Sequence, residues 1–182
     1  MEIVLIRHGK PVSANNPRVT AAGYASWVRD YNHSSVSESS RPCTTLQHKF
    51  REHYIVSSDL RRAMESAYIW QGREPMETHA EFREMDIPRY RLPLKLKAWT
   101  WLYLSRAFWT LGATGPFESF TEARVRAKKA SRRLVQLAET HERVVLFGHG
   151  YMNLYVRKEL LSLGWKVTEK SNKYWGVSCL KT

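Results

Sequence analysis

Cysteine is scarce in this sequence of 182 residues, with Cys43 and Cys179 the only two. Two cysteines cannot build the disulfide framework of a small secreted protein, and they lack the repeated spacing of a structural metal site. Long hydrophobic runs are also missing, because the longest strongly apolar stretch, residues 98–104, is interrupted by Thr100. A membrane-spanning helix needs roughly 20 apolar residues, so none is expected.

The N-terminus has no secretory signal pattern, since Met-Glu-Ile-Val-Leu-Ile carries no basic start and runs directly into Arg7 and His8. No internal repeat and no long linker divides the chain. Hydrophobic residues make up 43% and charged residues 25%, which is ordinary globular composition. We therefore expect a soluble, cytoplasmic protein consisting of a single domain over residues 1–182.

Acidic residues are few relative to basic ones. Asp and Glu total 17 against 29 Lys and Arg, which gives a net charge of +12 and a pI near 9.9. A chain this basic attracts anions in general, whether nucleic acid, an acidic membrane surface or phosphorylated small molecules. The total charge does not distinguish among these partners.

Strands and helices are expected to alternate along the chain. Apolar runs predict strands at residues 2–6, 54–56, 143–147 and 175–180, and the residues between them have helical periodicity or turn composition. Short, nearly continuous apolar strands favour a three-layer α/β/α domain with a mostly parallel central sheet.

Capping signals mark the expected helices. Thr20 begins a helix whose apolar residues recur at helical spacing, and Ser119 with Glu122 forms an S-x-x-E capping box for a helix reaching about residue 140. A third helix is expected over residues 60–71, capped by the polar residues 57–59. A fourth ends before Gly164. Residues 33–45 are serine-rich and predict an exposed loop.

Histidine and glycine occur together after two of the predicted strands, as Arg7-His8-Gly9 and as Gly148-His149-Gly150. A third strand leads into Arg61-Arg62 in the first turn of a helix. If these strands are parallel neighbours, their carboxyl ends bring both histidines and the arginines into one crevice. Arginines and helix N-termini are strong ligands for phosphate.

A histidine among arginines stays neutral at physiological pH, and a neutral imidazole is a competent nucleophile toward phosphorus. Arg7, Arg62 and His149 are suitable for stabilising charge on the transferring phosphoryl oxygens. A general acid is also required for the leaving oxygen, and the acidic stretch at residues 81–86 offers Glu81, Glu84 and Asp86. A rival interpretation of Arg62 is an ion pair with Glu65 on its own helix.

These segments resemble motifs of the histidine phosphatase superfamily, in the branch that includes phosphoglycerate mutases and small bacterial phosphatases. They occur in the family's order and cover nearly the whole chain. They are Leu5-Ile6-Arg7-His8-Gly9 for the RHG motif, Ser57-Ser58-Asp59-Leu60-Arg61-Arg62-Ala63 for the S-S-x-L-x-R-A segment, Phe82-Arg83-Glu84 for the L-x-E element, Glu118-Ser119 with Arg124 downstream for the E-S…R segment, and Val144-Val145-Leu146-Phe147-Gly148-His149-Gly150 for the second histidine.

The resemblance implies a metal-independent phosphomonoesterase with a phosphohistidine intermediate, no cofactor and an anionic phosphorylated substrate. It makes Arg62 rather than Arg61 the phosphate ligand, and Glu84 the proton donor. No metal ligands are expected, since no spacing supports a metal site. The implied catalytic residues are His8, Glu84, Arg7, Arg62 and His149, and the implied substrate-binding residues are Arg7, Arg62, His149 and Gly150.

Departures from the mutase pattern favour a phosphatase. The mutases typically continue the RHG motif with Glu-Ser and then an asparagine, whereas this chain continues Lys10-Pro11-Val12-Ser13-Ala14, and the mutases are longer. Gly150 follows the second histidine, where the acid phosphatase and phytase branch typically has an aspartate. A mutase-type phosphotransferase remains an alternative, as does a basic binding module without turnover, although no specific nucleic-acid motif is present.

The segment at residues 89–117 mixes basic and aromatic side chains, including Trp99 and Trp109. Its position resembles the variable insertion that caps the active site in this family, which implies a lid. A second interpretation is peripheral contact with an anionic membrane surface. A third is a core stripe or dimer contact formed by Trp99, Leu102, Tyr103 and Ala107. The sequence gives no oligomeric state.

Overall fold

The computed structural model describes all residues 1–182 and is organised around a sheet of six strands. These are β1 (Glu2–Arg7), β3 (Tyr54–Ser58), β4 (Glu77–His79), β6 (Arg143–Gly148), β7 (Lys166–Glu169) and β8 (Val177–Lys181). Their order is β4-β3-β6-β1-β8-β7; the first four run parallel, and the last two are antiparallel to their neighbours. The prediction of a mostly parallel α/β sheet is confirmed.

Helices cover both faces of this sheet, and two further short strands form a separate ribbon. The helices are α1 (Ala21–His33), α2 (Thr44–Lys49), α3 (Arg61–Gln71), the 3₁₀ turn η1 (Ala80–Phe82), α4 (Ala98–Thr110), α5 (Phe120–His141) and α6 (Gly150–Ser162). The ribbon pairs β2 (Arg18–Val19) with β5 (Leu96–Lys97) in antiparallel orientation.

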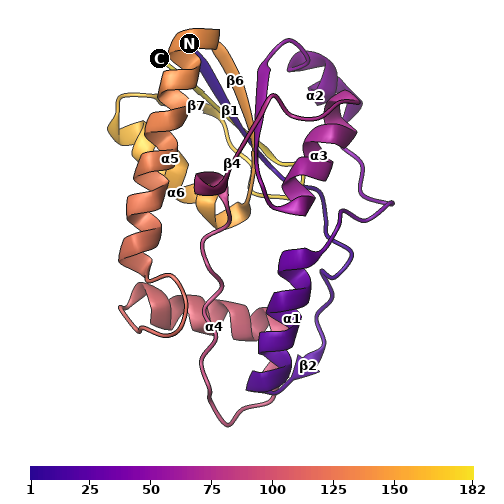
Figure 1. Cartoon of the computed structure of the whole chain (residues 1–182), viewed down its shortest axis with the longest axis vertical. Helices are drawn as coiled ribbons and strands as arrows, with labels where there is room; N and C mark the ends of the chain where they lie inside the picture. The colour runs from indigo at the N-terminus through magenta and orange to yellow at the C-terminus, as the bar shows by residue number, and fades with distance from the viewer.

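Alternation along the strands divides the core into two layers. In β1, Ile3 and Leu5 pack with residues of α5 and α6, whereas Val4 and Ile6 pack with residues of α3 on the opposite face. Figure 1 shows α5 and α6 on one side of the sheet and α2 and α3 on the other. Successive strand residues point to opposite faces, so a continuous apolar run fills both layers.

The predicted helix starts at Thr20 and Ser119 are confirmed. The Thr20 side chain accepts a hydrogen bond from the Gly23 backbone, and Ser119 and Glu122 form a complete capping box. Gly164 follows α6 with a left-handed φ of 91°, as expected for a residue after a helix end.

Two local expectations were wrong, and a third is confirmed in part. Leu60, not one of the polar residues 57–59, is the N-cap of α3; the Ser58 hydroxyl accepts from the Leu60 backbone N–H, and the Asp59 carboxylate pairs with Arg83. The predicted loop is present over residues 34–43 and is mostly exposed or half-buried, but Ser34 and Val36 are buried, and α2 begins at Thr44. The last strand begins at Val177 rather than residue 175.

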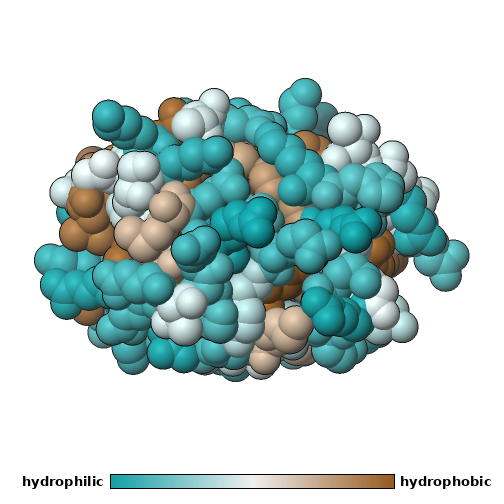
Figure 2. Space-filling view, turned by 90° about the horizontal axis from the view of Figure 1, so that it is seen from above, coloured by the Kyte–Doolittle hydropathy of each residue, from teal (hydrophilic) through white to brown (hydrophobic).

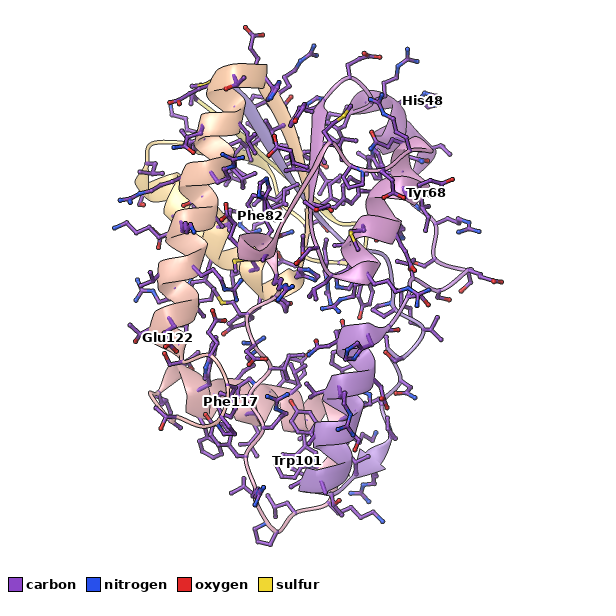
Figure 3. All side chains as sticks on the ribbon, viewed as in Figure 1. His48, Tyr68, Phe82, Trp101, Phe117 and Glu122 are labelled. Atoms are coloured by element: carbon purple, nitrogen blue, oxygen red, sulfur yellow. The ribbon has the colours of Figure 1, made fainter.

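Helices α1 and α4 pack against each other beyond the carboxyl ends of the central strands (Figure 1). Trp101 of α4 is fully buried and stacks on Tyr24 of α1, with ring centroids 5.6 Å apart, and it lies between the two helices in Figure 3. Its indole N–H donates to the Val19 carbonyl at 3.0 Å. The segment at residues 89–117 therefore contributes an aromatic cluster, while its role as a lid stays a prediction.

The buried stripe of α4 differs from the one expected. Ala98, Trp101, Ser105 and Trp109 are buried, whereas Tyr103 is 68% exposed. Both stripes have helical spacing, but aromatic and apolar residues lie on all sides of this helix, so periodicity alone does not select the buried face. No helix combines the length and hydrophobicity needed to cross a bilayer. The face shown in Figure 2 is mainly hydrophilic, with small scattered apolar groups.

The burial pattern of α4 predicts that substitutions of Trp101 and Tyr103 differ in their effect on stability. Trp101→Ala should lower the free energy of unfolding by about 3–5 kcal/mol, because it leaves a cavity and removes the indole N–H that donates to the Val19 carbonyl. Tyr103→Ala, at an exposed position, should change it by less than about 0.5 kcal/mol. Urea denaturation followed by fluorescence measures both values, and equal losses would contradict the burial pattern of α4.

Candidate active site

The carboxyl ends of three parallel neighbours, β3, β6 and β1, bring together residues that are far apart in sequence. Arg7 pairs in register with Gly148, and the His8 backbone N–H donates to the Gly148 carbonyl at 3.0 Å. The His8 and His149 rings consequently lie with centroids 5.1 Å apart. Both side chains are buried, with at most 1% exposed.

Hydrogen bonds determine the tautomer of His8. Its Nδ1 lies 2.7 Å from the Gly9 carbonyl oxygen, which can only accept, so Nδ1 carries the proton. Its Nε2 accepts from the Nε–H of Arg62 at 3.2 Å. Nε2 therefore carries no proton, as a nucleophile requires, and its lone pair accepts from Arg62 in the absence of substrate.

Arg62 reaches His8 from the first turn of α3 and is fully buried. Its Nη1 donates to the backbone carbonyls of Tyr31 and Asn32 at the end of α1. Its Nη2 has no partner in the protein. The alternative ion pair with Glu65 is not formed, because Glu65 pairs with Arg61 at 2.6 Å.

Arg7 is held by a turn before β8. Its Nη1 donates to the Asn172 carbonyl at 3.0 Å, and its guanidinium lies 4.1 Å from the ring centroid of Tyr174. A side chain on Gly150 would lie 3.3 Å from Arg7 Nε, so glycine at this position lets α6 approach the guanidinium. Sequence reasoning missed Tyr174, which also lies 5.7 Å from the His8 ring, and no motif indicates it.

Several buried nitrogen atoms around His8 have no hydrogen-bond partner in the protein. They are Arg7 Nε, Arg62 Nη2 and both ring nitrogens of His149. Unpaired buried donors are costly, and native proteins retain them mainly where a ligand or reaction uses them. The cluster is suited to several oxygen atoms of one tetrahedral anion.

Both histidines are held neutral. Burial lowers the pKa of His8 well below its ordinary value, and the charges of Arg62 and Arg7 lower it further. Burial likewise lowers the pKa of His149, again with contributions from Arg62 and Arg7. A neutral imidazole at position 8 keeps its lone pair at physiological pH.

The lowered pKa values of His8 and His149 predict that the free energy of unfolding decreases at acidic pH. Below pH 6.5 the unfolded chain binds protons at these positions that the folded chain refuses, so the free energy of unfolding decreases as pH falls. Above pH 6.5 both histidines are neutral in the folded and in the unfolded chain, so stability no longer depends on pH through them. Each histidine can add about 1.4 kcal/mol per pH unit to this slope. Urea titrations from pH 7.5 to 5.5 should show a shallower loss in His149→Gln, and exposed His48→Gln is the control that should keep the wild-type slope.

Glu84 lies beside the second histidine. His149 is the N-cap residue of α6, and the Glu84 carboxylate accepts backbone hydrogen bonds from Tyr151 at 3.2 Å and Met152 at 2.8 Å in the first turn. A third comes from Met85 at 3.0 Å. The charge of Glu84 also acts to raise the pKa of Arg62, although burial lowers that pKa overall.

The other acidic candidates lie in different contacts. Glu81 is 3.7 Å from Lys129, and Asp86 accepts from the Glu118 backbone at 3.2 Å. All three carboxylates line a cavity of about 940 Å³ between residues 79–87 and the start of α5. His8, Arg62 and His149 do not line it, so Glu84 is the predicted site residue that faces this space.

The arginine that pairs with Glu118 is not the one matched to the E-S…R segment. Arg126, not Arg124, forms two hydrogen bonds with the Glu118 carboxylate, at 2.7 and 2.6 Å. Arg124 is exposed, with its guanidinium 6.0 Å from the Phe120 ring. Helical spacing could have indicated Arg126, because it lies three residues after Ala123 and four before Ala130 of the buried stripe. The structure contains no cluster of three or more His, Cys, Asp or Glu side chains arranged to hold a metal ion.

Comparison with known proteins identifies relatives of this fold. The family model described as histidine phosphatase superfamily (branch 1) matches residues 3–173. No curated protein sequence matches the chain. Among solved structures, "Mycobacterial hydrolase 1" has a TM-score of 0.63 and 19% identity, covering 100% of this chain and 97% of the other.

Two further solved structures are named as phosphatases. Mycobacterial glucosyl-3-phosphoglycerate phosphatase has a TM-score of 0.57 and 20% identity, covering 100% of this chain and 97% of that one. Phosphoserine phosphatase from Entamoeba histolytica has a TM-score of 0.59 and 15% identity, covering 98% and 89%. At these identities the structural likeness establishes the fold alone.

Proposed function

The chain belongs to branch 1 of the histidine phosphatase superfamily, and from this membership we propose that it hydrolyses phosphomonoesters through a covalent phosphohistidine on His8. The observation that carries the proposal is the environment of His8 Nε2. This atom carries no proton and accepts a hydrogen bond only from Arg62. It lies among buried nitrogen atoms of Arg7, Arg62 and His149 that have no hydrogen-bond partner.

In the first step, His8 Nε2 attacks phosphorus in line with the departing oxygen. The N–P bond forms while the P–O bond to the alcohol breaks, and Glu84 gives its proton to that oxygen. Arg7, Arg62 and His149 donate hydrogen bonds to the phosphoryl oxygens, on which charge must be stabilised.

In the second step, water takes the place of the departed alcohol. Glu84, now a carboxylate, removes a proton from this water as the oxygen attacks phosphorus. The N–P bond breaks, phosphate leaves and neutral His8 is regenerated. No step of this cycle uses a metal ion or another cofactor.

We propose a small phosphorylated metabolite as the substrate class, with protein phosphohistidine as the alternative. Two structural neighbours are named for small phosphomonoesters, phosphoserine and glucosyl-3-phosphoglycerate, which supports the first class. The cavity beside Glu84, at about 940 Å³, has room for a leaving group of metabolite size. The net charge of +12 favours capture of anionic substrates.

The reaction class predicts a simple outcome. The purified chain should hydrolyse p-nitrophenyl phosphate at an undiminished rate in excess EDTA, because its own side chains supply every catalytic group. Arg62→Ala should raise KM and lower kcat together, since the guanidinium binds phosphate in the ground state and in the transition state. A phosphometabolite panel would then identify the substrate. Loss of activity in EDTA that added divalent metal restores would contradict the proposal.

Two rival functions give different results in the same preparation. A mutase-type phosphotransferase, supplied with a bisphosphate primer, would return the phosphoryl group to a monophosphate rather than to water. A binding module would show salt-dependent association with DNA or anionic vesicles and no hydrolysis.

A further inference from the structure

The Arg126 side chain of α5 contacts the segment that carries Glu84 at several points, although Arg126 belongs to none of the sequence motifs. Its guanidinium pairs with Glu118 through two hydrogen bonds, at 2.7 and 2.6 Å, in the bidentate arrangement that fixes an arginine in one orientation. Both side chains are partly buried, 22% and 21% exposed, so solvent screens this pair less than a surface ion pair.

The same guanidinium also binds the backbone that leads up to the proposed proton donor and the carbonyl of Glu84 itself. It donates to the carbonyl oxygens of Glu81 at 3.2 Å, Arg83 at 2.7 Å and Glu84 at 3.2 Å. The segment between η1 and β5 has no regular secondary structure here, so these hydrogen bonds replace the ladder that would otherwise fix its backbone.

Glu118 holds the next part of the segment. Its carboxylate lies 3.4 Å from the Asp86 backbone nitrogen, and its own N–H donates to the Asp86 carboxylate at 3.2 Å. The Glu84 backbone is thus held at its own carbonyl, at Arg83 before it and at Asp86 two residues after it, while its carboxylate points to the start of α6.

We propose that Arg126, oriented by Glu118, is the positioning residue that places the Glu84 carboxylate for proton transfer. This inference rests on the proposed function of Glu84. Arg126 does not touch the phosphoryl site, and it acts by fixing a backbone whose displacement by about 1 Å can cost 10²-fold in rate.

Leaving-group sensitivity tests this role. Phenyl phosphate needs a proton donor for its departing oxygen far more than p-nitrophenyl phosphate does, because p-nitrophenolate is a stable anion. Arg126→Ala should lower kcat/KM for phenyl phosphate by about 30-fold and for p-nitrophenyl phosphate by less than about 3-fold. Arg124→Ala, an exposed arginine two residues earlier on the same helix, is the matched control and should leave both values unchanged.

A double-variant cycle separates positioning from general structural support. In the Glu84→Gln background, Arg126→Ala should cost less than about 2-fold further with phenyl phosphate, since no proton donor remains to be misplaced. Equal losses with both substrates, or losses that simply multiply in the double variant, would overturn the inference. If Arg126→Ala does not fold, Glu118→Gln carries the same prediction with a smaller effect. Wild-type leaving-group behaviour in Glu84→Gln itself would instead overturn the role proposed for Glu84.

Discussion

His8→Asn should reduce phosphatase activity by about 10⁴-fold or more, since removing the nucleophile of a covalent mechanism eliminates the reaction path rather than weakening it. Asparagine is close to histidine in size and can still donate from Nδ2 to the Gly9 carbonyl, so the turn after β1 should persist. Two measurements test this result: activity against p-nitrophenyl phosphate, and transfer of ³²P from a labelled substrate to the protein. The wild type should show a label that is released by acid, and His8→Asn should show none.

His53→Asn provides a control matched in burial. His53 is 5% exposed, but its Nε2 lies 3.0 Å from the Glu2 carboxylate at the amino end of the sheet, away from the carboxyl ends that hold the site. Its replacement should change stability and leave specific activity per folded molecule intact. More than about 1% residual activity in His8→Asn, or a label of wild-type intensity, would contradict a phosphohistidine at this position.

The central sheet and the meeting of His8, His149 and Arg62 were predictable because each depends on strong local signals. A short apolar strand followed directly by a polar turn fixes where its last side chain lies, and parallel neighbours bring such turns to one edge. The structure pairs β1 with β6 and β6 with β3. This parallel pairing of strands distant in sequence is the one assumption on which the predicted meeting of these side chains depended.

Side-chain partners within uniform segments were less predictable. The helix α5 carries several basic residues on adjoining faces. Because each residue turns the helix by about 100°, Arg126 contacts Glu118 whereas Arg124, two residues earlier, is exposed. The helix α4 has aromatic residues all round, so its buried face depends on α1, which the sequence does not place. Tyr174 meets Arg7 through a turn in which Trp175 has a φ of 57°, a conformation with no signal in the sequence.

Glu84→Gln should lower kcat/KM for phenyl phosphate by about 10²–10⁴-fold, the usual contribution of a general acid. Glutamine keeps the length of the side chain and one of the two oxygens that accept from the Tyr151 and Met152 N–H groups, but it has no proton of suitable acidity to give. With p-nitrophenyl phosphate the loss in kcat/KM should be under about 10-fold, because that leaving group departs unprotonated. The kcat for the same substrate should fall further if hydrolysis of the phosphoenzyme limits turnover, since water then lacks its base.

Glu81→Gln and Asp86→Asn distinguish Glu84 from its acidic neighbours. Both carboxylates line the same cavity, but Glu81 lies beside Lys129 and Asp86 accepts from the Glu118 backbone, whereas Glu84 alone is hydrogen-bonded to the helix that begins after His149. Both variants should therefore keep the wild-type ratio of rates for phenyl and p-nitrophenyl phosphate. If Asp86→Asn changed that ratio and Glu84→Gln did not, the proton donor would be Asp86, and the leaving group would approach from the Glu118 side of the cavity.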